Sequence, residues 1–147
     1  MTSVQIRIIN RSKNELPAYA TAGAAGMDIR AHLNEDVVLQ PLGRALIPTG
    51  LYLEVPEGFE AQIRPRSGLA LRQGITCLNT PGAIDSDYRG EIKILLINLS
   101  SEEQVVSPAD RVAQMVIQKV EKALLEQVEV LEETGRADGG FGSTGKK

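Results

Sequence analysis

Residues 50–64, GLYLEVPEGFEAQIR, decide the fold class of this chain. The stretch has two halves separated by Pro-Glu-Gly at residues 56–58, and apolar residues occupy every second position in each half. These positions are Leu51, Leu53 and Val55 in the first half and Phe59, Ala61 and Ile63 in the second. A period of two indicates β-strands with one face in a core, and Pro with Gly indicates the turn between them.

The same pattern continues outside this stretch. Val4, Ile6 and Ile8 alternate near the N-terminus, and residues 91–99 (EIKILLINL) have the apolar middle of a strand buried on two sides. Pro and Gly recur at short intervals between residues 41 and 108. Frequent short strands with regular turn signals predict an all-β fold, a jelly-roll-like β-sandwich or barrel.

Two segments differ from the strand pattern. Residues 67–74 (SGLALRQG) predict one short helix, with Ser67 as its N-cap and Gly74 as its C-terminal stop. Residues 119–131 are ambiguous, because their apolar residues show both helical spacing and strand alternation. Helix and strand therefore both stay open for this segment.

Length and charge limit the classes of function. The 147 residues predict one domain, and the net charge of -3 argues against general nucleic-acid binding, which favours a basic face. No signal-peptide pattern and no run of 18 apolar residues occur, so we expect a cytoplasmic protein without a membrane contact. Cys77, in the apolar context GITCLN, predicts a buried thiol, and His32, which has no second His or Cys nearby, predicts a surface or turn residue.

Two segments combine residue types that suit a phosphorylated ligand. In residues 65–70 (PRSGLA), the guanidinium of Arg66, the hydroxyl of Ser67 and the first helix amides predict a phosphate cradle. In residues 79–92 (NTPGAIDSDYRGEI), a predicted long β-hairpin has at its tip Asp85, which could act as a general base, and Tyr88, whose ring could pack on a sugar. The alternatives are a capped helix with an exposed arginine and an ordinary polar turn.

Five segments in order then resemble the five motifs of the trimeric dUTPases, the deoxyuridine triphosphate nucleotidohydrolases. The segments are AGMDIRA, PRSGLA, GAIDSDYRGE, RVAQMVI and RADGGFGSTG, and they span residues 25–145. The resemblance implies a homotrimer with shared active sites that uses Mg²⁺ to split dUTP into dUMP and pyrophosphate, which lowers dUTP and supplies dUMP for thymidylate synthesis. It also implies a β domain over residues 1–133 and a flexible Gly-rich lid over residues 134–147, while nucleic acid and membrane are not implied as partners.

The resemblance also implies roles for individual residues. Asp85 would activate the attacking water, and Tyr88 would exclude a 2′-hydroxyl. The Mg²⁺ ion would be held mainly by the triphosphate, with no residue binding it directly, and Asp28 would support the site through water. The missing side chain of Gly82 would let the backbone approach the uracil closely. The uracil edge would be read by the backbone of Ala83, Ile84 and Lys93 and by the side chain of Asn79. The phosphates would contact Arg66, Ser67, Gly68 and Gln114. In the lid, Arg136, Gly142, Ser143 and Thr144 would close on the γ-phosphate, and Phe141 would cover the base.

Some residues depart from the family pattern. Ala109 and Ala137 stand where Gly is frequent, and Asp138 adds a negative charge near the expected triphosphate, so the departures bear on how the lid closes. Residues 140–146 also match half of a phosphate-binding P-loop, but the following Lys147 and the missing helix exclude that reading. Two alternatives stay open: a dCTP deaminase of the same fold and a non-catalytic β-trimer that binds partners.

Overall fold

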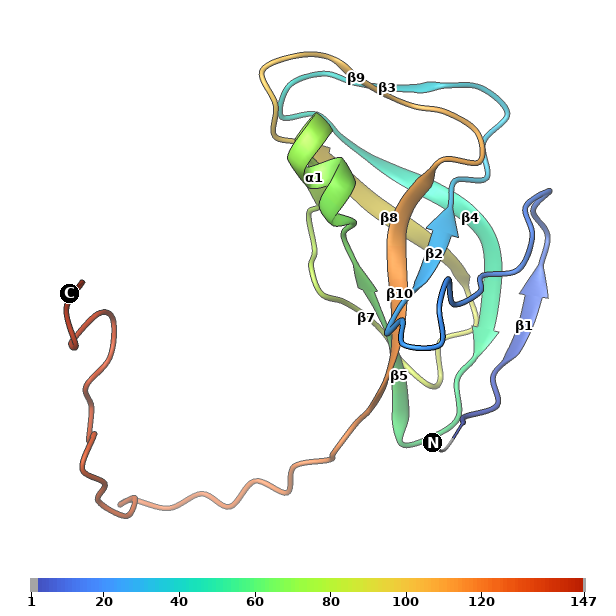
Figure 1. The fold of residues 1–147 in the computed structure, drawn as a ribbon. Helices are drawn as coiled ribbons and strands as arrows, with labels where there is room; N and C mark the ends of the chain where they lie inside the picture. Colours follow the sequence, from blue (N-terminus) through green and yellow to red (C-terminus); the bar gives the residue numbers. More distant parts are fainter. Residues whose placement is uncertain (1–2, 147) are drawn as a thin grey trace.

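Two four-stranded antiparallel sheets form the body of the molecule in the computed structural model, which describes residues 3–146 (Figure 1). The first sheet has the strand order β1-β4-β8-β6, the second has the order β2-β10-β5-β7, and β3 and β9 form a separate two-stranded sheet. The elements are β1 (Arg7–Asn10), β2 (Met27–Arg30), β3 (Val37–Leu39), β4 (Arg44–Glu54), β5 (Phe59–Arg64), α1 (Ser67–Gln73), β6 (Ile75–Cys77), β7 (Gly82–Ile84), β8 (Glu91–Asn98), β9 (Gln104–Val106) and β10 (Arg111–Lys119). The predicted all-β sandwich with one short helix is confirmed.

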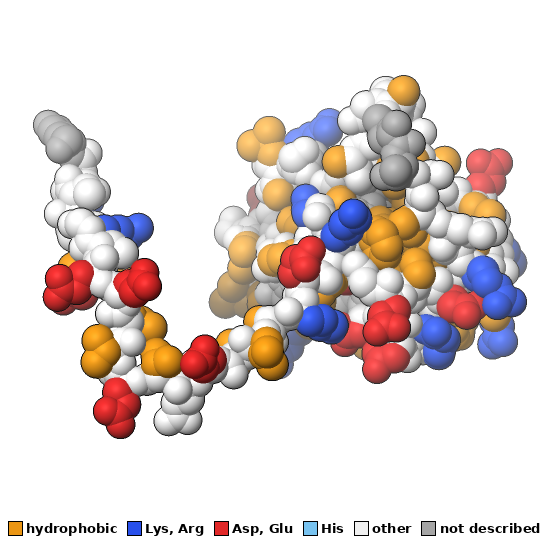
Figure 2. Space-filling view, turned by 90° about the horizontal axis from the view of Figure 1, so that it is seen from below, with side chains coloured by type: hydrophobic (Ala, Val, Ile, Leu, Met, Phe, Trp, Pro, Cys, Tyr) orange, Lys and Arg blue, Asp and Glu red, His pale blue; other side chains and the backbone are white. Residues whose placement is uncertain are grey.

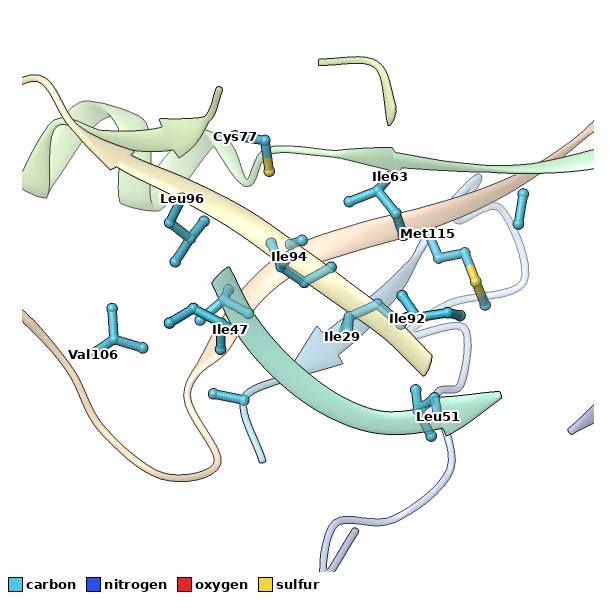
Figure 3. Close-up of a cluster of buried hydrophobic side chains, with 14 of the residues drawn as sticks. Ile29, Ile47, Leu51, Ile63, Cys77, Ile92, Ile94, Leu96, Val106 and Met115 are labelled. Atoms are coloured by element: carbon cyan, nitrogen blue, oxygen red, sulfur yellow. The ribbon is translucent and has the colours of Figure 1, made fainter. Parts of the chain in front are cut away.

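The core lies between the two sheets, where the alternating apolar residues meet (Figure 3). Ile47 and Ile94 of the first sheet and Ile29 and Met115 of the second belong to one buried cluster. Burial of one such side chain stabilises the fold by about 1.5–3 kcal/mol. The residues of the opening stretch take part as predicted, since Leu51, Leu53, Val55, Ala61 and Ile63 are all buried and Phe59 packs against them.

Strand β8 differs from the prediction of burial on two sides. Ile92, Ile94 and Leu96 are buried against the second sheet, but Leu95 and Ile97 on the other face are only half-buried. The reason is that the first sheet is covered by the second sheet on one face only. The outer face of β8 therefore keeps apolar side chains in contact with solvent in the single chain.

Helix α1 confirms the predicted helix but not its cap. Gly74 ends the helix in the left-handed conformation, with φ of 65°, as predicted. The residue in the N-cap position is Arg66, which has an extended backbone and makes no side-chain capping bond, so the assignment of Ser67 as N-cap was wrong. Ser67 is already the first helical residue, and the guanidinium of Arg66 instead reaches Asp28 in β2.

The predicted long hairpin is present and has an unexpected excursion. Strands β6 and β8 pair antiparallel, from Ile75 opposite Asn98 to Cys77 opposite Leu96. Between them, β7 leaves the first sheet and pairs with β5 of the second. The tip of the hairpin therefore connects the two sheets.

Beyond β10 the chain leaves the body as a C-terminal arm, which we define as residues 120–133 (Figures 1 and 2). The arm is anchored where the amide of Val120 donates to the carbonyl of Gly58 at 2.9 Å, and it then forms neither helix nor strand, so neither open alternative applies in the single chain. Leu124 is 98% exposed and Leu125 is 90% exposed. Within residues 3–146, no helix is long and apolar enough to cross a membrane.

Candidate functional site

A cleft of about 490 Å³ is lined by residues of β7, of the turn that follows it and of β8. It brings together seven of the eight residues that were expected around a deoxyuridine group, and the eighth, Phe141, does not line it. The seven are Asn79, Gly82, Ala83, Ile84, Asp85, Tyr88 and Lys93. These residues come from the excursion between β6 and β8 and from the start of strand β8 itself. The fold of the hairpin therefore builds the cleft.

Strand β7 presents its backbone to the cleft because it is an edge strand. It pairs with β5 on one side, with Gly82 opposite Ile63 and Ile84 opposite Ala61, and no other described strand pairs with its second edge. Backbone groups along an unpaired edge can exchange hydrogen bonds with a planar ligand. The edge of β7 is therefore suited to read a base, as was expected for Ala83 and Ile84.

The turn that follows β7 carries Asp85 and Tyr88, and both residues line the cleft. The amide of Tyr88 donates to the carbonyl of Asp85 at 3.2 Å. Arg89, to which sequence reasoning gave no role, donates from Nη1 to the carbonyls of Ser86 at 2.6 Å and Tyr88 at 3.1 Å. Arg89 thus stabilises the turn through these two hydrogen bonds. The carboxylate of Asp85 is exposed at the cleft and makes no ion pair among the described residues.

A second group, which we call the Asp28 cluster, comprises Asp28, Arg66, Arg111 and Gln114. The two carboxylate oxygens of Asp28 each accept one guanidinium: Oδ1 lies 3.0 Å from Nε of Arg66, and Oδ2 lies 3.2 Å from Nη1 of Arg111. Gln114 lies opposite Asp28 in the β2–β10 register and donates from Nε2 to the carbonyl of Pro65 at 3.0 Å. Two cations around one anion leave a net positive charge, which suits an anionic ligand.

Ser67 and Gly68 are the first two residues of α1 and follow Arg66 directly. The structure thus brings Arg66, Gln114 and Asp28 together as predicted and places Ser67 and Gly68 beside them. Arg111 is an addition, because a single arginine at the start of an apolar strand gives no signal of its partner. Its partner follows only from the pairing of β10 with β2.

The cleft and the Asp28 cluster are separate surfaces of one chain, since no residue of the cluster lines the cleft. The residues of the expected lid lie apart from both. Arg136 donates to the carbonyl of Gly139, residues 141–144 form a turn, and Phe141 is fully exposed. Among the described residues, no hydrogen bond joins residues 134–146 to the cleft or the cluster, so one chain holds the three parts without assembling them.

The donor set fits a magnesium ion that arrives with a phosphate ligand. No group of three or more His, Cys, Asp or Glu residues that could hold a metal occurs in the described part of the chain. Each oxygen of Asp28 already accepts one guanidinium group, which favours a contact of this carboxylate with a metal through bound water. Mg²⁺ keeps several waters and is often held by substrate phosphates, which agrees with this arrangement.

A family model described as dUTPase matches residues 12–145. The chain belongs to the dUTPase family. A curated dUTPase relative, the deoxyuridine 5'-triphosphate nucleotidohydrolase of Finegoldia magna, is 57% identical over 142 residues, which cover 97% of this chain and 99% of that protein. The family resemblance seen in the sequence is confirmed.

Solved dUTPase structures share the fold. The dUTPase of Staphylococcus bacteriophage 80alpha, determined with dUpNHpp, is 25% identical with a TM-score of 0.84, over 97% of this chain and 99% of that chain. The dUTPase of phage phi11 of S. aureus, in which a structural Mg(II) ion is coordinated, is 24% identical with a TM-score of 0.77, over 88% of this chain and 100% of that chain.

Proposed function

We propose that this chain hydrolyses dUTP to dUMP and pyrophosphate with Mg²⁺, as its family membership indicates. The observation that carries the proposal is the cleft, which gathers a base-reading strand edge, an aromatic ring and a free carboxylate from one hairpin. The activity would lower dUTP and supply dUMP for thymidylate synthesis. A cytoplasmic location goes with this proposal, because free nucleotides are the substrate, and cell fractionation would test it.

Asp85 is the proposed general base. Its carboxylate takes a proton from a water whose oxygen forms a bond to the α-phosphorus, while the bond from that phosphorus to the bridging oxygen breaks and pyrophosphate leaves with the electron pair. Asp28 is unsuited to this step because both of its oxygens hold arginines. Its proposed role is to orient Arg66 and to support the metal shell through water.

The phosphates are bound, in this proposal, by Arg66, Ser67, Gly68 and Gln114 of one copy. Donors arranged in advance around a reacting phosphate stabilise the charge that develops there. Mg²⁺ would add further neutralisation of the phosphate oxygens.

The base is selected by Gly82, Ala83, Ile84, Lys93 and Asn79. Cytosine reverses part of the donor and acceptor pattern of uracil, and thymine adds a methyl group that a tight cleft excludes. Tyr88 lies under the deoxyribose, where its ring leaves no space for a 2′-hydroxyl.

A homotrimer completes the site in this proposal. The cleft and the Asp28 cluster are separate within one chain. The arm exposes Leu124, Leu125 and Leu131, and burial of each of these side chains would stabilise the assembly by about 1.5–3 kcal/mol. A neighbouring copy would cover the arm and bring the cluster of one chain to the cleft of another. Sedimentation of a monomer at micromolar concentration would contradict this assembly.

The lid of residues 134–147 is a separate unit from the domain of residues 1–133 in this proposal. Arg136, Gly142, Ser143 and Thr144 would close on the γ-phosphate, and Phe141, which is fully exposed in the free chain, would cover the base.

A nucleotide panel tests the function. Pyrophosphate and ammonia release are measured with dUTP, dCTP, dTTP and UTP, each with and without Mg²⁺. We expect pyrophosphate from dUTP, with activity that depends on Mg²⁺. Ammonia from dCTP would instead identify a deaminase, and no product from any of the four would indicate a non-catalytic trimer.

A further inference from the structure

Tyr88 is held both at its backbone and at its phenol hydroxyl, although the residue is 46% exposed. At the backbone end, its amide donates to the carbonyl of Asp85 at 3.2 Å. At the far end, the phenol hydroxyl donates to the carbonyl of Glu91 at 2.9 Å. An exposed tyrosine usually leaves its hydroxyl to water, so the second bond gives the ring one defined orientation.

Gly90 makes this orientation possible. A Cβ atom at position 90 would lie 2.6 Å from Cζ of Tyr88 and 2.9 Å from Cε2, and closer still to the hydroxyl oxygen. Real Cβ atoms essentially never approach other atoms below 3.0 Å. The ring therefore lies directly on the backbone of residue 90, and any side chain there would displace it.

Glu91, whose carbonyl receives the hydroxyl, is itself fixed to the centre of the fold. Its carboxylate Oε1 accepts the amide of Gly50 at 2.9 Å, at the irregularity where the β4–β8 register shifts. The next residue, Ile92, accepts the buried hydroxyl of Thr49 at 2.6 Å. The acceptor of the Tyr88 hydroxyl is therefore connected to β4, outside the turn itself.

We propose that Gly90 and Glu91 are specificity-determining positioning residues that act through Tyr88, an inference that rests on the proposed function. Steric exclusion of one hydroxyl oxygen requires a ring that does not move aside, because a displacement of about 1 Å is enough to change selection. Gly90 provides the surface on which the ring lies, and Glu91 provides the bond that holds it there. The pair thus sets the preference for dUTP over UTP.

The test compares two ratios of kcat/KM, dUTP to UTP and dUTP to dCTP, with kcat and KM determined separately by pyrophosphate release. Gly90→Ala should lower the dUTP:UTP ratio by about tenfold, because the ring must leave its position. Tyr88→Phe, which removes only the hydroxyl, should lower the same ratio by about threefold to tenfold, as expected for one hydrogen bond. In both variants the dUTP:dCTP ratio should stay within about twofold of the wild type, since β7 reads the base.

Matched variants serve as controls. Gly23→Ala makes the same chemical change where a Cβ meets nothing within 4 Å, and it should leave both ratios unchanged. Glu91→Gln keeps an oxygen that can accept the Gly50 amide and should retain most of the dUTP:UTP ratio, whereas Glu91→Ala should lose it.

The inference is overturned if Gly90→Ala and Tyr88→Phe both keep the wild-type dUTP:UTP ratio. It is also overturned if the dUTP:UTP and dUTP:dCTP ratios fall together in these variants, which would indicate a general loss of structure. If Gly90→Ala does not fold, Tyr88→Phe decides, because it adds no atom. A wild-type protein that releases no pyrophosphate from dUTP contradicts the proposed function instead. In that case the affinities for dUMP and UMP, measured by calorimetry, give the sugar selection without turnover and test Gly90 and Glu91 directly.

Discussion

Asp28 and Asp85 show how two aspartates of one chain acquire different roles. Both oxygens of Asp28 are engaged by Arg66 and Arg111, and the side chain retains only 34% of its exposure. Asp85 is exposed at the cleft, makes no ion pair within residues 3–146, and uses only its backbone carbonyl to support the turn. A carboxylate that must accept a proton needs a free oxygen, so the geometry favours Asp85.

Asp85→Asn should abolish most of the hydrolysis and leave dUTP binding largely intact. Loss of a general base typically lowers the rate by about 10²–10⁴-fold. Single-turnover kinetics measure the rate, and calorimetry with a non-hydrolysable analogue measures binding. Asp87→Asn in the same turn is the control, since Asp87 does not line the cleft. A decrease of less than about tenfold for Asp85→Asn would show that another group is the base.

Cys77 should not react with thiol reagents in the native protein. The residue is 2% exposed, as predicted, and burial raises its pKa from 9.0 to about 11. The folded state therefore keeps the proton more tightly than the unfolded chain, so this contribution to stability is complete below pH 9 and is lost as the pH rises toward 11. Labelling with a disulfide reagent at pH 8, with and without urea, checks this, and rapid labelling of the folded protein would contradict the buried position.

At the scale of elements, short antiparallel strands position the site. β7 has only three residues, yet it carries the base-reading edge and connects the hairpin of one sheet to the other sheet. Helix α1 has seven residues and no fully buried side chain, and its position depends on its two ends and on Leu69, which is half-buried against the core. Arg66 is tied to Asp28 at the first end, and Gly74 accepts the amide of Leu99 at 2.9 Å at the second.

Gly74→Ala should destabilise the fold by about 1–2 kcal/mol, because alanine is strained at positive φ. The φ of Gly74 is 65°, and a Cβ there would lie 2.9 Å from the amide nitrogen of Ser100. Urea unfolding followed by circular dichroism measures the change. Gly23→Ala, in open space, should be close to neutral, and equal effects of the two substitutions would refute the role given to the helix end.

At the scale of the whole molecule, one chain is an incomplete site. The cleft, the Asp28 cluster and the lid occupy different parts of the surface, and the arm carries exposed apolar and acidic side chains away from the body (Figure 2). The outer face of the first sheet is also apolar, with Leu46 55% exposed and Leu95 half-buried beside it. These surfaces are what a trimer with shared sites would bury.

Deletion of residues 134–147 should leave a folded trimer that hydrolyses dUTP poorly. We expect kcat/KM to fall by about 10²-fold, the loss typical of removing one prearranged donor from a reacting oxygen. Sedimentation and steady-state kinetics measure the two properties. Deletion of residues 146–147 alone, which retains the fifth motif, is the control, and full activity of the longer deletion would show that the lid has no role.

Much of the fold and of the candidate site could be predicted. Alternation identified β4 and β5, and the spacing of Ser67 and Gly74 identified α1. The cleft contains the residues that the resemblance assigned to the nucleoside, except for Phe141 of the lid. Predictions for Ser67 and for the outer face of β8 were wrong, and Arg111 received no role. Each of these depends on what packs against the residue, which a local pattern does not contain.

The sequence by itself determined the periodicity of the strands, the turns between them and the order of the five motifs, because these are properties of neighbouring residues along the chain. Only the tertiary structure decided which distant residues meet. Asp28 contacts Arg66 and Arg111, which lie 38 and 83 positions away, and β7 leaves its hairpin for the other sheet. Such contacts follow from sheet register and from the packing of two sheets on one core, and these are set by the free energy of the whole molecule.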